Sequence, residues 1–178
     1  MRKINTFLLL IIISEVVSAQ KPGNFHLYDK NTFYVEILGN TGSLSLNYDR
    51  LLYQSPQIKI AGRIGYAYLP VKFPIQGIPF EISVLASGMG NHHFELGTGV
   101  SYIKGLEHHY IIRDFAENKE YISESLFIPF RIGYRYQRQD GGLFVKAGLV
   151  PLVSIYDFEK YYTKKSYVWL GLGLGYSF

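Results

Sequence analysis

The sequence predicts an all-β protein, an eight-stranded antiparallel β-barrel that crosses a membrane as an up-and-down meander. Three observations lead to this prediction. Apolar residues recur at every second position in the clearest segments, bulky and small or charged side chains fall on opposite faces, and the connections alternate between short and long. Successive side chains of a strand point to opposite faces, so a period of two indicates strands, and helical spacing fits none of these segments.

The composition agrees with a membrane barrel. The 178 residues include 16 Tyr, 12 Phe and 18 Gly, and charged residues make up only 18%. A soluble domain of this size usually carries more charge, and the apolar content is too high for a disordered chain. The net charge of +4 is too small and scattered to indicate nucleic-acid binding. The absence of cysteine excludes disulfides, thiolate metal sites and a cysteine nucleophile.

The first 19 residues have the features of a secretory signal peptide. Arg2 and Lys3 are basic, Phe7–Ile13 is an apolar run, and Val17–Ala19 offers a cleavage site. The run is too short to span a bilayer, which takes about 20 helical residues, although an uncleaved anchor is the alternative. We therefore expect the mature chain to begin at Gln20. The predicted organisation is a cleaved signal peptide over residues 1–19, a short periplasmic segment over 20–31 and a transmembrane barrel over 32–178.

Eight segments are expected to form the strands of the barrel. Four show clear alternation: Ser43–Leu52, Ile58–Leu69, Leu126–Gln137 and Val168–Phe178. Four are weaker: Thr32–Gly39, Phe80–Ser87, His93–Ile103 and Leu143–Ser154. An even number of strands lets an antiparallel sheet close with both termini on one side of the membrane.

The connections between these segments set the expected orientation. Those after the second, fourth and sixth strands are short: Gln54–Pro56, Gly88–Asn91 and Gln139–Gly142. Those after the third, fifth and seventh are longer: Val71–Pro79, Lys104–Ser125 and Tyr156–Lys165. The first outer connection, Asn40–Gly42, is short. Short periplasmic turns and long extracellular loops are typical of outer-membrane barrels, which places both termini in the periplasm.

The two faces of the strands favour a membrane barrel over a soluble one. An eight-stranded barrel is only just wide enough for its own side chains, so bulky residues at every inward position do not fit. The face expected to point inward carries small residues and charges, and its glycines are Gly65, Gly97, Gly99, Gly133, Gly171, Gly173 and Gly175. Aromatic residues are expected at both membrane interfaces. Those at the outer ends are Tyr66, Tyr68, Phe80 and Tyr102, and those at the inner ends are Phe33, Tyr48, Phe94, Tyr134, Tyr136, Tyr176 and Phe178.

The inward positions carry nearly balanced charges. The acids are Glu36, Asp49, Glu81 and Glu95, and the bases are Lys59, Arg63, Arg131, Arg135 and Lys146. Buried charges must be paired, so we expect a lumen closed by salt bridges, with a narrow pore as the alternative. The predicted network consists of Glu36, Asp49, Glu95, Arg63, Arg131, Arg135 and Lys146. In it Glu36 lies near Arg63 and Arg131, and Asp49 and Glu95 lie within reach of Arg135 and Lys146.

No motif indicates catalysis, a cofactor or a metal. His92-His93 lies at a predicted turn and His108-His109 in the long outer loop, and no histidine is followed by serine two places on. Gly-x-Ser-x-Gly and glycine-rich phosphate motifs are absent too. Zinc needs three or four ligands with suitable geometry, so we expect His92 and His93 to be solvated turn residues. The prediction is a protein that is not an enzyme and has no cofactor.

The C-terminal segment resembles the assembly signal of bacterial outer-membrane barrels. It ends in Phe178, with Tyr176, Leu174, Leu172 and Leu170 at every second place before it. About residues 30–178 are similar in plan and length to the OmpA/OmpX-like barrels. The resemblance implies residence in the cell outer membrane, in contact with its lipid, and recognition of the last strand by the barrel-assembly machinery.

The resemblance says less about function, because the class includes anchors, adhesins and enzymes. We expect a structural or interaction protein whose function is carried by its extracellular loops, with a lipid A- or lipid-modifying enzyme as the alternative and a narrow pore third. The mixed polar loop Lys104–Ser125 is the candidate surface for an extracellular partner, and it is equally a candidate mobile cap.

Overall fold

The structure is a computed structural model, and it describes residues 28–69, 75–87, 90–108, 120–157 and 166–178. The predicted signal peptide and its cleavage site lie outside the described residues. No helix among the described residues is long and apolar enough to cross a membrane.

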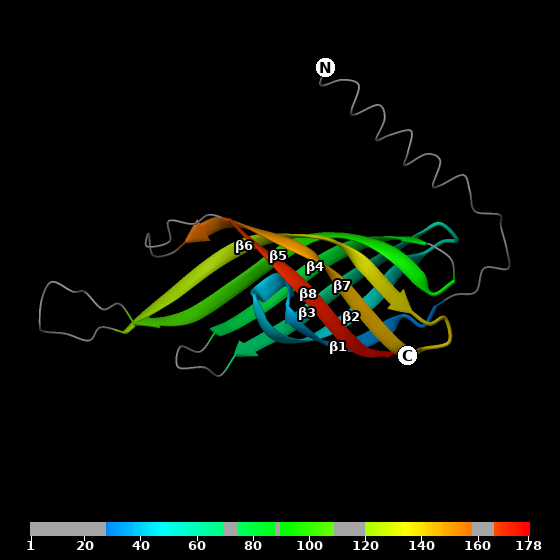
Figure 1. The fold of residues 1–178 in the computed structure, drawn as a ribbon, viewed down its shortest axis with the longest axis horizontal. Helices are drawn as coiled ribbons and strands as arrows, with labels where there is room; N and C mark the ends of the chain where they lie inside the picture. The colour runs from blue at the N-terminus through cyan, green and yellow to red at the C-terminus, as the bar shows by residue number, and fades with distance from the viewer. Residues whose placement is uncertain (1–27, 70–74, 88–89, 109–119, 158–165) are drawn as a thin grey trace, which may run out of the picture.

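Eight antiparallel strands close into a barrel in which each strand pairs with its sequence neighbours and β8 pairs with β1 (Figure 1). The strands are β1 (Asn31–Leu38), β2 (Ser43–Gln54), β3 (Ile58–Leu69), β4 (Ile75–Ser87), β5 (His92–His108), β6 (Glu120–Gln137), β7 (Gly142–Asp157) and β8 (Ser166–Ser177). This architecture confirms the predicted eight-stranded antiparallel meander. Asn31 and Phe178 exchange two backbone hydrogen bonds, so the barrel begins and ends at one end. We call this the inner end and the opposite one the outer end.

Strands β4 to β6 reach farther toward the outer end than the sequence predicted. β4 begins at Ile75 rather than Phe80, β5 continues to His108, and β6 begins at Glu120. The prediction of one loop over Lys104–Ser125 is therefore wrong at both ends, and its residues 109–119 lie outside the described part. The ladder explains the extension, because Gly105 pairs with Ile75 on one side and Ser123 on the other.

Two prolines lie inside these longer strands, Pro79 in β4 and Pro129 in β6. A proline has no N–H for the ladder, so it usually marks an edge or an interruption of a sheet. The β3–β4 ladder skips two pairs beside Pro79, and the β5–β6 ladder skips two beside Pro129. On its other side Pro79 pairs with Ser101, and Pro129 pairs with Leu152. The strands therefore continue through both prolines at the cost of local gaps.

The outer surface of the barrel is apolar. Alternate side chains along all eight strands are exposed and large, as in Ile37, Leu46 and Leu172. Of the aromatic residues, Tyr66 and Tyr68 lie at the outer end of β3, and Phe33 packs against Tyr48 and Phe178 at the inner end. The predicted position at the outer ends of the strands was wrong for Phe80 and Tyr102. Both face outward in the middle of β4 and β5, because these strands are longer than predicted.

The segment before β1 closes the inner end of the barrel. Tyr28 is buried, and its hydroxyl donates to the Gly90 carbonyl at 2.6 Å. The Tyr28 ring lies beneath the Lys59 ammonium at 4.2 Å and edge-on to His93 at 5.2 Å. His93 is only 2% exposed, so the prediction of a solvated turn residue is wrong for it. The reason is parity, because His93 is the first inward residue of β5.

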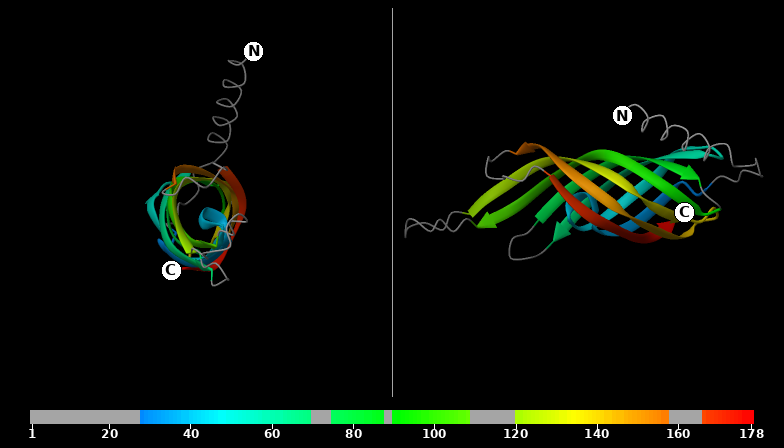
Figure 2. Two further views of the ribbon diagram at one scale, coloured as in Figure 1. Left: turned by 90° about the vertical axis from the view of Figure 1, so that its left-hand side faces the viewer. Right: turned by 45° about the horizontal axis from the view of Figure 1, so that its top comes forward.

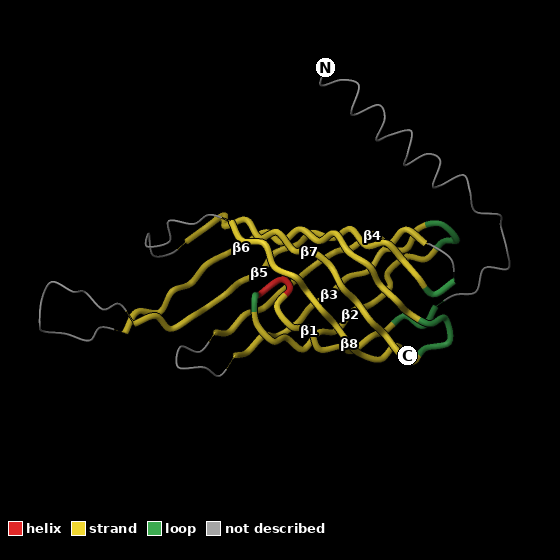
Figure 3. Tube along the Cα trace, viewed as in Figure 1, coloured by secondary structure: helices red, strands yellow, loops and turns green. Residues whose placement is uncertain are grey.

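The first outer connection folds into the lumen instead of facing outward. Residues Gly39–Thr41 form the 3-10 turn η1, which lies within the ring of strands (Figure 2) and beside β8 (Figure 3). Asn40 is 1% exposed. The reversal needs positive φ at Leu38, Gly39 and Gly42, which glycine adopts freely and leucine does not. Nothing in the periodicity of the sequence indicated this fold of the connection.

The buried charge network of the lumen

Nine charged side chains point into the barrel, and each is at most 2% exposed. They come from β1 to β7: Glu36, Asp49, Lys59, Arg63, Glu81, Glu95, Arg131, Arg135 and Lys146. The inward positions of β8 over the same depth are Gly171, Gly173 and Gly175. A Cβ at Gly171 would lie 2.9 Å from Glu36 Oε1 and 3.1 Å from Arg131 Nη1. Glycine on β8 thus leaves the space that the long charged side chains occupy.

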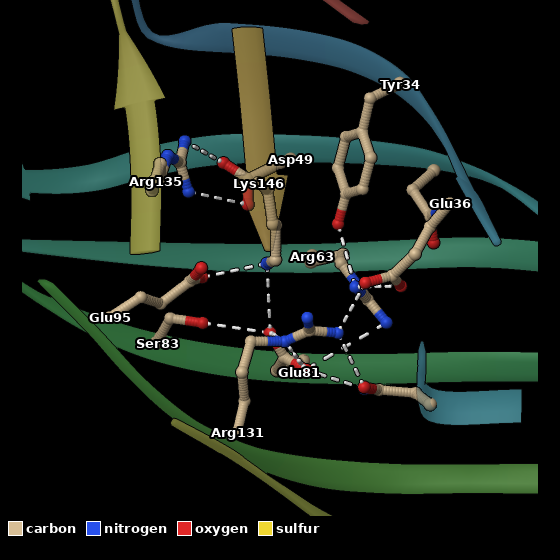
Figure 4. A network of polar contacts seen from close by, with 12 residues as sticks. Tyr34, Glu36, Asp49, Arg63, Glu81, Ser83, Glu95, Arg131, Arg135 and Lys146 are labelled. Atoms are coloured by element: carbon tan, nitrogen blue, oxygen red, sulfur yellow. Dashed lines mark hydrogen bonds and ion pairs between the residues drawn. The ribbon is translucent and has the colours of Figure 1, made fainter. Parts of the chain in front are cut away.

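Glu36 and Glu81 hold the two arginines at the centre of the network (Figure 4). Glu36 lies 2.8 Å from Arg63 Nη1 and 2.7 Å from Arg131 Nη2. Glu81 accepts from Arg131 Nε at 3.2 Å and lies 3.9 Å from Arg63 Nη2. Two carboxylates and two guanidiniums therefore neutralise one another across the barrel, joining β1, β3, β4 and β6.

Uncharged groups add further hydrogen bonds to this centre. Asn40 of η1 donates to Glu81 Oε2 at 2.6 Å and accepts from Arg131 Nη2 at 2.9 Å. The Tyr34 hydroxyl accepts from Arg63 Nη1 at 2.8 Å, and Ser83 donates to Glu81 at 3.0 Å. The side-chain amide of Asn40 thus links η1 to the network through both its nitrogen and its oxygen atom.

A second cluster lies toward the inner end. Arg135 binds Asp49 with two parallel hydrogen bonds, of 2.7 and 3.1 Å, which is the strongest geometry for this pair of groups. Arg135 also donates to Gln137 and stacks over Phe144 at 4.8 Å. Lys146 connects this level with the centre, because its ammonium lies 2.8 Å from Glu95 and 3.3 Å from Glu81.

The buried charged groups that fill the lumen each depend on an oppositely charged partner. Five bases face four acids, and all are removed from water. A single charge left alone in such surroundings is strongly destabilising, whereas a paired set is tolerated. The arrangement can therefore close the barrel electrostatically and sterically, and it ties seven strands together.

All seven residues of the predicted network lie within these two clusters. Glu81 and Lys59 were placed inward by their parity but were left out of the predicted network, and Glu81 is its most connected acid. Lys59 lies apart, over the Tyr28 ring at the inner end. Asn40 and Tyr34 were not foreseen, since the sequence does not show that η1 turns inward or that a large ring fits beside Arg63.

The described histidines have neighbours other than a metal site. Among the described residues no group of three or more His, Asp or Glu is arranged to hold a metal ion. His92 Nδ1 lies 2.6 Å from the Tyr134 hydroxyl, and the His93 ring packs on Tyr28. His26, His109 and the rest of residues 109–119 of the predicted outer loop lie outside the described residues.

The residues of the predicted C-terminal assembly signal lie on the outer face of the barrel. Leu170, Leu172, Leu174, Tyr176 and Phe178 are all 49–62% exposed. They form one apolar row along the outer face of β8 and its end, and β8 closes the barrel by pairing with β1.

Comparison with known proteins supports the fold. No family model matches the sequence, and no curated protein matches it. The structure is similar to the crystal structure of the N-terminal β-barrel domain of Pseudomonas aeruginosa OprF, with a TM-score of 0.54 and 11% sequence identity. The match covers 86% of this chain and all of that one. The likeness confirms the predicted OmpA-like barrel fold.

Proposed function

We propose that this chain is an integral barrel of the bacterial outer membrane with a structural or interaction role, whose closed lumen anchors an outer end that contacts other molecules. The observation that carries this proposal is that apolar side chains lie on the outside of the barrel and charged ones on the inside, the reverse of a soluble barrel. The outside exposes rows of Leu, Ile, Val and Phe on every strand, and the inside holds nine buried charges. Water solvates such a surface poorly and lipid solvates it well, so the apolar band is expected to lie in the bilayer.

The outer end supports an interaction role. Pairing of β4 with β5 stops at Ile75 and Gly105, and pairing of β6 with β7 stops at Ser125 and Asp157. Beyond these pairs β5 and β6 continue together to His108 and Glu120, so this hairpin projects past its neighbours (Figure 1). The end of this hairpin, at His108 and Glu120, would thus be presented farther from the membrane than the neighbouring strands. We propose this part of the 104–125 segment as the surface for an extracellular partner.

We expect the projecting hairpin to face the outside and the termini to face the periplasm. Trypsin added to intact cells should then cleave after Arg113 or Lys119 and leave Arg138, at an inner turn, untouched. Mass spectrometry of the fragments identifies the sites. Permeabilised cells serve as the control for inner sites. Cleavage at Arg138 in intact cells, with residues 109–119 protected, would reverse the orientation.

A lumen closed by ion pairs should not conduct. In planar bilayers the purified protein is expected to give no large steady conductance, because Arg63, Arg131 and Glu81 occupy the middle of the barrel. A barrel with a known open channel, inserted under the same conditions, is the positive control. A steady conductance from the unmodified protein would replace the structural role with that of a narrow pore. Release of fatty acids from lipopolysaccharide or phospholipid by the purified protein would favour the lipid-modifying enzyme instead.

A further inference from the structure

One outward-facing cation at the inner end of the barrel has no partner among the described residues. Arg50 of β2 is exposed, and the residues on either side of it, Asp49 and Leu51, are buried, so its side chain points away from the lumen. The hydrogen bonds and ion pairs within the described part of the chain do not include the Arg50 guanidinium. The undescribed segments that adjoin inner-end elements in the sequence, residues 20–27 and 88–89, contain no Asp or Glu. No described carboxylate therefore neutralises this charge.

The exposed charges toward the outer end are arranged differently. Lys104 on β5 and Glu124 on β6 lie opposite each other in the ladder and form an ion pair of 3.0 Å. Arg50 instead has Asn31 of β1 on one side of it and Gly62 of β3 on the other. Neither an amide nor a glycine can neutralise a guanidinium. Arg50 is thus left for an anion that does not belong to the described chain.

An aromatic row lies next to Arg50 on the side of the outer end. The Phe33 ring packs against Tyr48 and Phe178. Phe33 and Tyr48 form the ladder pair two residues farther toward the outer end than the pair of Asn31 with Arg50. Aromatic belts of membrane proteins lie at the level of the lipid headgroups. The Arg50 guanidinium therefore lies where the phosphates of the periplasmic leaflet are expected.

The surroundings of Arg50 offer further hydrogen-bond donors and positive charge. The Tyr48 hydroxyl donates to Asn31 Oδ1 at 2.7 Å, which leaves the Nδ2 hydrogens of Asn31 for another acceptor. Lys30 is exposed, and its carbonyl accepts from the Leu51 backbone N–H at 2.8 Å, so a second cation lies beside Arg50 along the chain and the ladder. The planar guanidinium of arginine matches two oxygens of a phosphate at once.

We propose that Arg50 and Asn31 bind the phosphodiester of one phospholipid in the periplasmic leaflet, with Lys30 adding positive charge. The proposal rests on the membrane location and orientation proposed above. The phosphodiester carries the missing negative charge and is held by its lipid at this depth. The acyl chains of the same lipid would lie along the exposed pair of Val35 and Leu46, beyond the aromatic row. A dissolved anion would find the same donors but no apolar surface to contact.

Solid-state NMR measures the contact directly. The full mature protein, with ¹³C at the Cζ atom of every arginine, is refolded into vesicles of phosphatidylcholine and phosphatidylglycerol in phosphate-free buffer, so that all phosphorus belongs to lipid. We expect ³¹P to dephase part of the arginine signal, because Arg63, Arg131 and Arg135 are buried but Arg50 is not. Arg50→Gln should remove most of this dephasing, and Arg138→Gln, at an exposed inner turn, should remove little. Dephasing in Arg50→Gln equal to that of the wild type would overturn the proposal.

Asn31→Asp gives an independent check, because it supplies the carboxylate that Arg50 lacks and keeps the size of the side chain. The new ion pair should displace the phosphate, so dephasing should fall to the level of Arg50→Gln although the arginine is still present. The heat-dependent gel shift shows that both variants are folded. Unchanged dephasing in folded Asn31→Asp would mean that the guanidinium does not hold the phosphate, and the proposal would fail.

The same samples test the membrane location separately. Proton magnetisation from the acyl-chain methylenes should reach labelled leucine side chains of the outer face, such as Leu172. Transfer to these leucines without ³¹P dephasing of arginine would overturn the phosphate site alone. Absence of this transfer would refute the membrane location, and the phosphate site with it.

Discussion

Glu81→Gln is expected to lower the free energy of unfolding by about 3–5 kcal/mol, the cost of removing one partner from a buried ion pair. Glu81 lies within 3.3 Å of Arg131 and Lys146, accepts from Asn40 and Ser83, and also faces Arg63. The amide keeps the size of the side chain and removes its charge. The lumen would then hold three acids and five bases. The excess positive charge would stay buried, because none of these side chains is exposed to water.

Equilibrium unfolding in urea from lipid vesicles, followed by Trp169 fluorescence and by gel shift, measures this change. Glu124→Gln is the matched control, because Glu124 forms a 3.0 Å ion pair with Lys104 that is partly exposed. Exposed pairs contribute little, so this variant should unfold like the wild type. Adding Lys146→Met to Glu81→Gln restores the original charge difference and should recover part of the lost stability. Equal unfolding of the Glu81 and Glu124 variants would mean that water reaches the network.

The strand pattern was predictable because, in the membrane barrel that we propose, lipid and lumen impose opposite demands on alternate residues. The clearest case is the alternation of Leu170, Leu172 and Leu174 with Gly171, Gly173 and Gly175. The leucines suit the proposed contact with lipid. Glu36 and Arg131 lie beside Gly171, and Tyr34 lies beside Gly173 and Gly175. The same parity placed Glu36, Glu81 and Arg131 inside the barrel. Charge balance and position along the strands then indicated that Glu36 lies near Arg63 and Arg131, but did not show that Glu81 binds both arginines.

The features that the sequence did not reveal depend on residues far apart in the chain. Strands β4 to β6 extend because each finds a partner, and Pro79 is tolerated because only one of its two ladders is interrupted. The inward fold of η1 depends on Asn40 meeting Glu81 and Arg131, which lie 41 and 91 residues away. His93 is buried because Tyr28 closes the barrel beneath it. The local alternation of residues does not indicate contacts between residues that are far apart in the chain.

Tyr167 and Trp169 are exceptions to the division between an apolar outside and a small or polar inside. Alternation placed Trp169 on the same face as Gly171, Gly173 and Gly175, and Tyr167, which lies before the predicted strand Val168–Phe178, continues that face because β8 begins at Ser166. They lie beyond the end of the ladder between β1 and β8, because β1 turns inward at Leu38 and its last pair with β8 is Ile37–Leu172. The position of a strand end, rather than the composition of any strand, thus creates room for large rings inside a narrow barrel.

Leu172→Arg should destabilise the protein by about 2–4 kcal/mol, because the guanidinium would be placed near the middle of the bilayer. Leu172 lies in the middle of β8, is 49% exposed, and pairs with Ile37 and Ala147. The cost should depend on depth, so Tyr176→Arg, near the inner end of the same row, should cost less. Gln57→Arg, in an exposed inner turn, should cost nothing measurable. Unfolding in urea from vesicles measures all three variants. In water an outward arginine at any of the three sites would be solvated alike, so equal stabilities would show that this face of β8 does not contact lipid.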